Sequence, residues 1–177
     1  MHNNAEKVVP LTEKDVIEFV TGRFSSVKKS KKIRDLVEFQ AMNKYMLMAH
    51  NQEKLKILGN LVASHKKISL SEILEQYEYH LSLALKKEPT DKSHSNVIMH
   101  IFGYFSKDFS PAEKDLFSEL LCQFREHKIT IGKLLAEIHR LIYRFNKTYL
   151  ASQTYFLLYS DKRPGVLFAI LNENSPK

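Results

Sequence analysis

Apolar residues recur at helical spacing along almost the whole chain, and residues that favour helix starts precede most of the apolar stretches. The strongest start is Ser110-Pro111-Ala112-Glu113, which combines an N-cap serine, a proline at the first helical position and a glutamate at the third. No segment of useful length alternates apolar and polar residues as a strand does, and no Asn-Gly or Asp-Gly hairpin turn occurs. The sequence therefore predicts an all-α fold, a single-domain bundle of about seven helices.

Helix-start signals and apolar spacing place these helices along the chain. A helix from Thr12-x-x-Asp15 to about Val27 precedes the basic run Lys28–Arg34, which either continues the helix or breaks it. Further helices are expected over Arg34–Ala49, from the N-cap Asn51, from the capping box Ser69-x-x-Glu72 to about Lys87, from Ser110, and over Thr130–Thr148 or beyond. Val37 and Leu116 are expected in the core. Val166–Leu171 fits either one short strand or a tail docked on the helices.

Composition limits the class of protein. The 177 residues are 44% hydrophobic with a mean hydropathy of −0.31, and the longest apolar run is far too short to span a bilayer. The N-terminus is polar and lacks the apolar segment of a secretory signal, so we expect a cytoplasmic protein without membrane contact. A flexible segment over 1–11, one all-α domain over 12–160 and a tail over 161–177 are the expected parts. The net charge of +7 and the pI of about 9.3 make nucleic acid a partner worth testing.

Cysteine and histidine positions argue against a metal or a cofactor. Cys122 is the single cysteine, which excludes an intramolecular disulfide and any site built from cysteines alone, and its place after Leu120-Leu121 predicts a small core residue. Among the eight histidines, His94 and His100 point about 120° apart on one helix, and no His-x-x-x-His pair occurs. Nucleophile-elbow, P-loop and dinucleotide-binding motifs are absent.

A polar stripe runs along the otherwise apolar segment Ser93–Lys107. Asn96, His100, Gly103 and Lys107 fall within about 60° of one another on a helix, opposite Val97, Ile98, Ile101, Phe102 and Phe105. Hydrophobic packing does not require Asn, His and Gly in register. The stripe is therefore either a solvent-exposed face or a site.

The last predicted helix carries a basic face and a second polar line. Lys133, Arg140, Arg144 and Lys147 form the basic face, while His139, Asn146 and Gln153 recur every seven residues at the edge of the apolar face. The basic face fits phosphate contacts, and Tyr143, Tyr149 and Tyr155 are near enough to stack on bases. A second basic cluster is Lys28–Arg34. The alternative is that both clusters are ordinary solvated helix faces and that the polar line is a core boundary.

Three groups of residues form a wider pattern. The first group is Lys44-Tyr45 with Met48-Ala49-His50-Asn51, followed by Leu58-Gly59 and Val62-Ala63. The second group is His94-x-Asn96-Val97 with His100 and Gly103-Tyr104-Phe105. The third group is Tyr149-Leu150 with Gln153 and Tyr155. Together with their spacing, over roughly Asp35–Tyr159, they resemble the motifs of the YbgA-like family, a domain of unknown function. Where the family pattern ends in proline-flanked aromatic residues, this chain reads Phe156–Ser160.

The resemblance implies a general setting and a set of residues. Members of the family stand alone or behind a cysteine-bearing domain that resembles a thiouracil desulfidase, which implies work near modified pyrimidines, RNA or nucleotide salvage, with a desulfidase-like domain or protein as a possible partner. This chain lacks that domain, so no iron–sulfur chemistry transfers to it. The pattern marks as site residues His50, His94, Asn96, His100, Gly103, Tyr104, His139, Tyr149, Gln153 and Tyr155.

These features combine into one hypothesis. The Asn96–His100–Tyr104 stripe and the His139–Gln153 line are expected to face each other across a groove, with Gly103 allowing a ligand or helix to approach closely. Arg140, Arg144 and Lys147 would hold a phosphate, so the predicted function is a binding module for RNA, single-stranded DNA or a nucleotide. The alternatives are an enzyme acting on a modified nucleoside with His100 or His139 as acid–base, and a structural or protein-interaction domain with buried hydrogen-bond networks.

Overall fold

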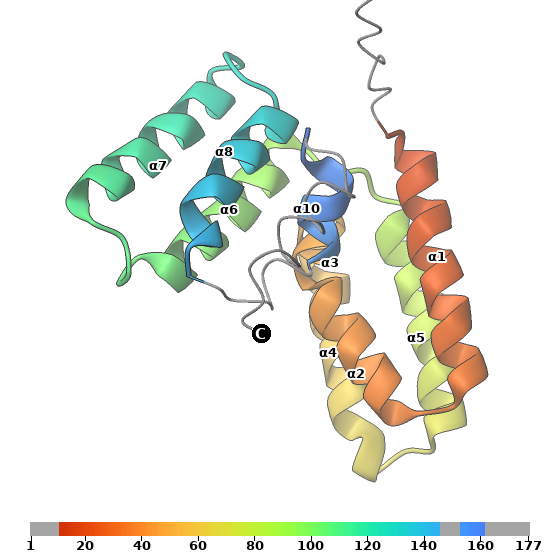
Figure 1. The fold of residues 1–177 in the computed structure, drawn as a ribbon. Helices are drawn as coiled ribbons and strands as arrows, with labels where there is room; N and C mark the ends of the chain where they lie inside the picture. Colours follow the sequence, from red (N-terminus) through yellow and green to blue (C-terminus); the bar gives the residue numbers. More distant parts are fainter. Residues whose placement is uncertain (1–10, 146–152, 162–177) are drawn as a thin grey trace, which may run out of the picture.

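Every regular element is helical in the residues that the computed structural model describes, residues 11–145 and 153–161 (Figure 1). The elements are α1 (Glu13–Ser30), α2 (Ile33–Met42), α3 (Lys44–His50), α4 (Gln52–Ala63), the short 3-10 helix η1 (Ser64–Lys66), α5 (Leu70–Leu85), α6 (Asp91–Phe105), α7 (Pro111–Arg125), α8 (Ile131–Tyr143) and α10 (Thr154–Tyr159). The predicted all-α class is confirmed. The predicted end segments 1–11 and 161–177 lie almost wholly outside the described residues, and the domain boundaries stay predictions.

The helix starts lie where the sequence predicts them. Thr12 and Ser110 each form a complete capping box, with Asp15 and Glu113 as the reciprocal partners. Asn51, Ser69 and Thr130 each accept a hydrogen bond from the backbone N–H three residues further on. These side chains satisfy backbone donors that the first helical turn leaves free, so local chemistry fixes where the helices begin.

Two breaks divide the N-terminal helices. Lys31 ends α1 in the left-handed conformation with φ 51°, so the basic run Lys28–Arg34 breaks the helix instead of continuing it. The single helix predicted over Arg34–Ala49 is wrong, because Asn43 separates α2 from α3. The Asn43 side-chain amide donates to the carbonyl oxygen of Phe39 at 2.8 Å and so competes with the regular backbone pattern. This break and the short α10 give more helices than the seven expected.

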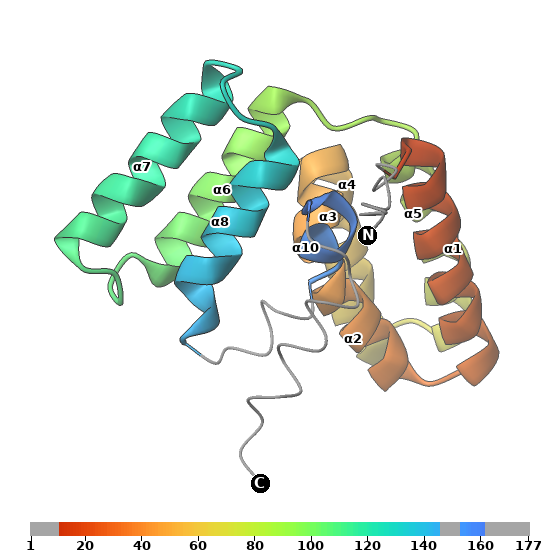
Figure 2. The same ribbon diagram turned by 45° about the horizontal axis from the view of Figure 1, so that its top comes forward.

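Short helices join two groups of longer ones. Helices α1, α2, α4 and α5 pack together, as do α6, α7 and α8, while α3 contacts both α4 and α6. Figures 1 and 2 show α10 between the two groups, and it contacts both α3 and α8. One connected cluster of buried side chains runs through both groups, including the Phe24–Tyr77 ring stack at 5.2 Å. None of the described helices is long and apolar enough to cross a lipid bilayer.

Three residues expected in the core lie at the surface. Val37 is 44% exposed, Leu116 is 47% exposed, and Cys122 is exposed with its thiol 3.5 Å from the Glu126 carboxylate. The buried face of α7 consists of Phe117, Leu120, Leu121 and Phe124. At 100° per residue, Leu116 lies about 40° beyond Leu120 at one edge of this face, and Cys122 lies about 100° beyond Leu121 at the other. An apolar neighbour in the sequence therefore does not place Cys122 in the core.

Candidate functional site

The structure divides the predicted site residues into a buried and an exposed set. His50, His94, His139, Gln153 and Tyr155 are buried. His100, Tyr104, Arg140 and Arg144 are exposed, and Asn96 is half-buried. Tyr149 and Lys147, together with Asn146, lie outside the described residues, and the side chain of Tyr143 does too. The hypothesis of one groove between the two polar lines is therefore wrong in its geometry, because His100 faces solvent while His139 and Gln153 are in the core.

The buried set centres on His50 at the end of α3. Its Nδ1 lies 2.8 Å from the carbonyl oxygen of Lys87, which can only accept, so Nδ1 carries the hydrogen. Its Nε2 lies 2.9 Å from the hydroxyl oxygen of Tyr159 on α10. Burial lowers the pKa of His50, partly offset by the bond to Lys87, so the neutral ring accepts the Tyr159 hydroxyl proton at Nε2.

Glu13 extends this contact to the first turn of α1. The Tyr159 hydroxyl oxygen lies 3.3 Å from both carboxylate oxygens of Glu13, and His50 Nε2 lies 3.6 Å from one of them. Burial raises the pKa of Glu13 above its ordinary value, although the Tyr159 bond opposes this. Tyr159 has one hydroxyl proton and two neighbouring acceptors, so it can donate either to His50 Nε2 or to the Glu13 carboxylate, but not to both at once.

His94 and Tyr155 lie beside this trio. His94 is in the first turn of α6, and its Nδ1 is 2.7 Å from the hydroxyl oxygen of Tyr155. Its ring meets the Tyr159 ring edge-on at a centroid distance of 5.2 Å. Burial lowers the pKa of His94 to about 4, so this ring is neutral at pH 7. Glu13, His50, His94, Tyr155 and Tyr159 are called the histidine–tyrosine cluster below.

Gln153 and His139 belong to the core around α10. The Gln153 side-chain amide donates to the carbonyl oxygen of Ala41 at 2.7 Å, and its oxygen accepts from the Tyr45 backbone N–H at 3.4 Å. His139 on α8 meets the Phe156 ring edge-on at 5.9 Å. Gln153 therefore joins α10 to the α2–α3 junction by hydrogen bonds, and His139 packs α8 against α10. Both contacts favour the alternative that this polar line is a buried hydrogen-bond network.

The polar stripe on α6 is exposed at its centre, His100. Asn96 donates to the side-chain oxygen of Gln52 at 3.2 Å, and Tyr104 is 48% exposed. A Cβ placed on Gly103 would meet no atom of the described residues within 4 Å. None of the described helices therefore packs against Gly103, the expected approach of a ligand stays a prediction, and the stripe lies on a largely exposed face of α6.

Both arginines predicted to bind phosphate, Arg140 on α8 and Arg144 directly after it, already face a carboxylate. Arg140 donates to Glu137 at 3.3 Å. Arg144 donates to Glu113 at 2.6 Å, and Glu113 also closes the capping box of α7 with Ser110. The Arg144 bond, with help from Ser110, lowers the pKa of Glu113 to about 2, so the carboxylate is charged at physiological pH.

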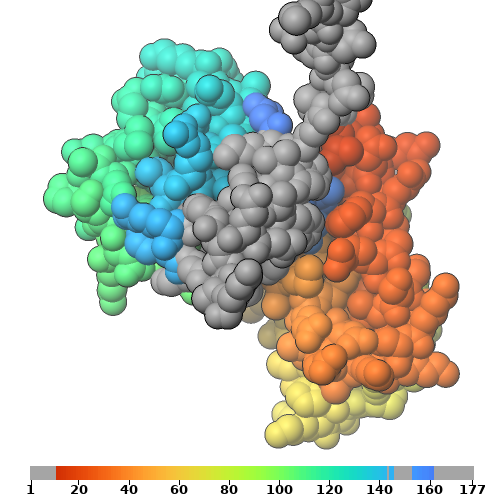
Figure 3. Space-filling view, viewed as in Figure 1, coloured from red at the N-terminus to blue at the C-terminus, as the bar shows by residue number. Residues whose placement is uncertain are grey.

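The second basic cluster is less neutralised and is joined by another basic run. Lys28 and Lys31 line the same depression as Leu70 and Ser71 at the start of α5, directly after Lys66 and Lys67 of the η1 turn. Figure 3 shows the α1–α2 turn and the η1 turn side by side at one end of the molecule. Lys28 pairs with Glu78 at 2.5 Å and Arg34 with Glu38 at 3.5 Å. Within the described residues, Lys29, Lys31, Lys32, Lys66 and Lys67 make no ion pair; these five lysines are called the basic end.

The described residues offer no metal site, since no three His, Cys, Asp or Glu side chains in 11–145 and 153–161 are grouped to hold an ion. Sequence reasoning missed two members of the histidine–tyrosine cluster. Tyr159 follows Tyr155 by four residues and so shares its helix face, which is a usable signal. Glu13 carries no such signal, because its contact spans 146 residues of sequence.

Comparison with known proteins yields a family without an assigned function. A family model described as "Protein of unknown function (DUF1722)" matches residues 44–160. The chain is 26% identical over 125 residues to the "Uncharacterized protein YbgA" of Escherichia coli (strain K12), covering 70% of this chain and 74% of that protein. No solved structure shows a significant match. The matched range contains four of the five members of the histidine–tyrosine cluster and excludes Glu13.

Proposed function

We propose that this chain, which belongs to the DUF1722 family of proteins of unknown function, binds RNA or single-stranded DNA through the basic end. The observation that carries the proposal is that the fold brings two basic runs, far apart in the sequence, to one end of the molecule, with five lysines free of ion pairs among the described residues. Phosphate groups are the ligands that such a surface attracts most strongly.

Two helix starts lie at this end, and each carries one acidic residue in its first turn, Asp35 in α2 and Glu72 in α5, which offsets part of the positive end of the helix dipole. α2 begins after Lys32, whose side chain makes no capping hydrogen bond, and α5 begins after Ser69, next to Lys66 and Lys67. The first turn of a helix presents free backbone N–H groups and a partial positive charge, both of which favour an anion. Arg140 and Arg144 support the proposal less well, because Glu137 and Glu113 already neutralise them.

The test is fluorescence anisotropy with labelled transfer RNA, single-stranded DNA and duplex DNA. Wild type is compared with Lys29→Glu/Lys32→Glu at the basic end and with Lys114→Glu/Lys133→Glu, a matched charge change on exposed residues of α7 and α8. We expect the first variant to weaken binding at least about tenfold and the second to weaken it far less. Equal loss in both variants would mean that only net charge matters, and absence of binding to all three probes at low salt would discard the proposal.

A second candidate function is acid–base chemistry at the histidine–tyrosine cluster. The observation in its favour is the single Tyr159 hydroxyl shared by His50 and Glu13, which can donate its proton to either of them but not to both at once. This moves the acid–base role from His100 and His139, where the sequence predicts it, to His50. The test is turnover of a panel of modified nucleosides, which His50→Gln would abolish while leaving the circular dichroism spectrum of the folded protein unchanged.

A further inference from the structure

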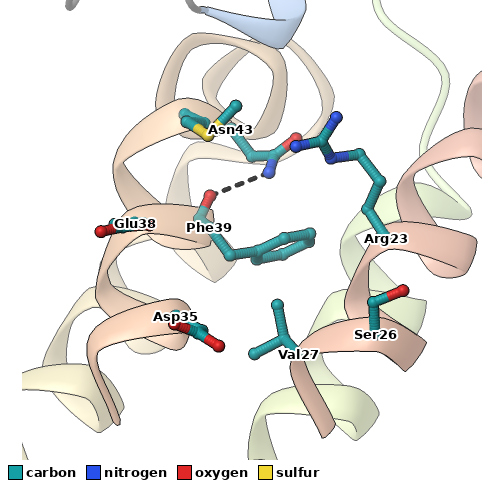
Figure 4. A pocket seen from close by; sticks show the side chains of 8 residues that line it. Arg23, Ser26, Val27, Asp35, Glu38, Phe39 and Asn43 are labelled. Atoms are coloured by element: carbon teal, nitrogen blue, oxygen red, sulfur yellow. Dashed lines mark hydrogen bonds between the residues drawn. The ribbon is translucent and has the colours of Figure 1, made fainter. Parts of the chain in front are cut away.

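Two hollows lie on opposite faces of α2, and their linings differ. The pocket toward α1, of about 310 Å³, includes the charged residues Arg23, Asp35 and Glu38 (Figure 4). The groove toward α4, of about 450 Å³, has an almost wholly apolar surface and is called the α2–α4 groove below. Helix α2 contributes Val37, Gln40 and Ala41 to it, and α4 contributes Leu55, Gly59 and Val62. None of these residues belongs to the histidine–tyrosine cluster or to the basic end.

The α2–α4 groove leaves apolar side chains open to solvent. Val37 is 44% exposed, and Leu55 is half-buried. A single exposed apolar residue is ordinary at a protein surface, but a continuous apolar groove between two helices is typical of a docking site for an apolar helical segment. From Leu55 to Val62 helix α4 rises about 10 Å, so the groove suits a short segment.

Gln40 places a hydrogen-bond donor in this apolar lining. Its side-chain oxygen accepts from the Tyr77 hydroxyl, and its side-chain nitrogen would lie 3.7 Å from a Cβ built on Gly59. This nitrogen makes no hydrogen bond with any described residue. Because the last carbonyl groups of a helix have no partner within that helix, a donor at this place suits a short helical segment.

The chain itself contains an apolar segment close to this groove. The described part of the chain ends at Asp161, and after four more residues the sequence has six apolar residues in succession, Val166–Leu171, which lie outside the described residues. The other stretches outside the described residues, 1–10 and 146–152, contain no apolar run of this length. Six apolar side chains are stabilised by leaving water.

Helix α10 brings this segment within reach of the groove. The Gln153 side chain, at the start of α10, donates to the carbonyl oxygen of Ala41 at 2.7 Å, and Ala41 lines the groove. Asp161 follows Gln153 by eight residues, most of them helical, so the two lie at most about 16 Å apart. The five steps from Asp161 to Val166 span up to about 17 Å. Val166 can therefore reach the Ala41 end of the groove.

Charge favours one direction for the segment. Val37 is nearer than Ala41 to the start of α2, and that start lies at the basic end. A segment that enters beside Ala41 and continues toward Val37 brings Glu173, two residues after the apolar run, toward Lys66 and Lys67. Neither lysine makes an ion pair with a described residue, so both are open to a carboxylate.

We infer that Val166–Leu171 docks in the α2–α4 groove as a short helix that runs from Ala41 toward Val37. On such a helix Leu167, Phe168 and Leu171 share one face within about 100°, and this face is the one that meets the groove. The same chain is a better occupant than a second copy, because a stable dimer buries about 800 Å² on each partner and this groove is only about 10 Å long. The inference does not depend on nucleic-acid binding.

The test is disulfide cross-linking in the full chain, with Cys122→Ser removing the exposed native thiol. One protein carries Val37→Cys and Leu171→Cys, and the matched control carries Leu116→Cys and Leu171→Cys. Val37 is 44% and Leu116 is 47% exposed, so both new thiols are accessible and neither change opens the core. Under mild oxidation we expect the Val37 pair to close within one chain at least about tenfold faster than the Leu116 pair, because docking raises the effective concentration of the two thiols.

A further variant tests whether the apolar face causes the closure. Leu167→Asp/Phe168→Asp, added to the Val37 pair, should slow closure to the rate of the Leu116 pair. Three results would overturn the inference. They are equal rates for the two pairs, closure of the Val37 pair that the two aspartates leave unchanged, and cross-linked dimers in place of closed monomers, which would assign the groove to a second copy.

Discussion

Acidification should destabilise this protein through His94. The ordinary pKa of histidine is 6.5, and burial lowers that of His94 to about 4 in the folded protein. Between these values the unfolded chain binds a proton that the folded protein does not, so stability falls as the pH drops from 6.5 toward 4. Because of this pKa difference, the free energy of unfolding decreases by at most about 3 kcal/mol once the pH is below 4. About 2 kcal/mol of this decrease falls between pH 7 and pH 5.

The assay is urea unfolding at pH 7 and pH 5 for wild type and for His94→Gln, which keeps a side chain able to hydrogen-bond Tyr155 but cannot titrate. The wild type should lose about 2 kcal/mol more between the two pH values than the variant does. On acidification, the lowered pKa of His50 also decreases stability, whereas the raised pKa of Glu13 increases it. Both residues are present in wild type and variant, so their effects cancel in the comparison. Equal losses in wild type and His94→Gln would refute the reasoning.

Three other changes probe the fold and its surface. Tyr159→Phe leaves His50 Nε2 and the Glu13 carboxylate without their shared partner and should lower the free energy of unfolding by about 1–3 kcal/mol in urea. An unchanged midpoint would contradict the hydrogen bonds assigned to the Tyr159 hydroxyl. Gly103→Ala adds a methyl group to open space within α6 and should stabilise the protein by about 0.5–1 kcal/mol in the same assay; a loss of stability would mean that something packs there. Cys122 should react with a thiol reagent in the folded protein, more slowly at pH 7 than an isolated thiol, because the Glu126 carboxylate raises its pKa; reaction only after unfolding would contradict its exposure.

Local chemistry made much of the fold predictable. The caps at Thr12, Asn51, Ser69, Ser110 and Thr130 act within three residues of sequence, so the positions of these helix starts could be inferred from the sequence alone. The break at Asn43 could not be inferred, because it comes without a proline or glycine and depends on a side chain that bonds its own backbone.

The candidate site was harder to predict because it depends on distant contacts. Helical spacing correctly groups Asn96 with His100, but it does not say whether that face meets solvent or another helix. The His50–Tyr159 bond spans 109 residues, and Gln153 reaches Ala41 across 112. A family pattern marked His50, His94 and Tyr155 together, while Glu13, which lies outside the matched range, became visible only through its contact with Tyr159.

The most direct test of the nucleic-acid proposal is the salt dependence of binding to labelled single-stranded RNA, measured by anisotropy between about 50 and 200 mM salt. If about four lysines of the basic end contact phosphates, the logarithm of the association constant should fall against the logarithm of salt concentration with a slope of about −3. Lys29→Glu/Lys32→Glu should reduce the steepness to about half. A slope near zero, or one that this double substitution leaves unchanged, would contradict binding through the basic end.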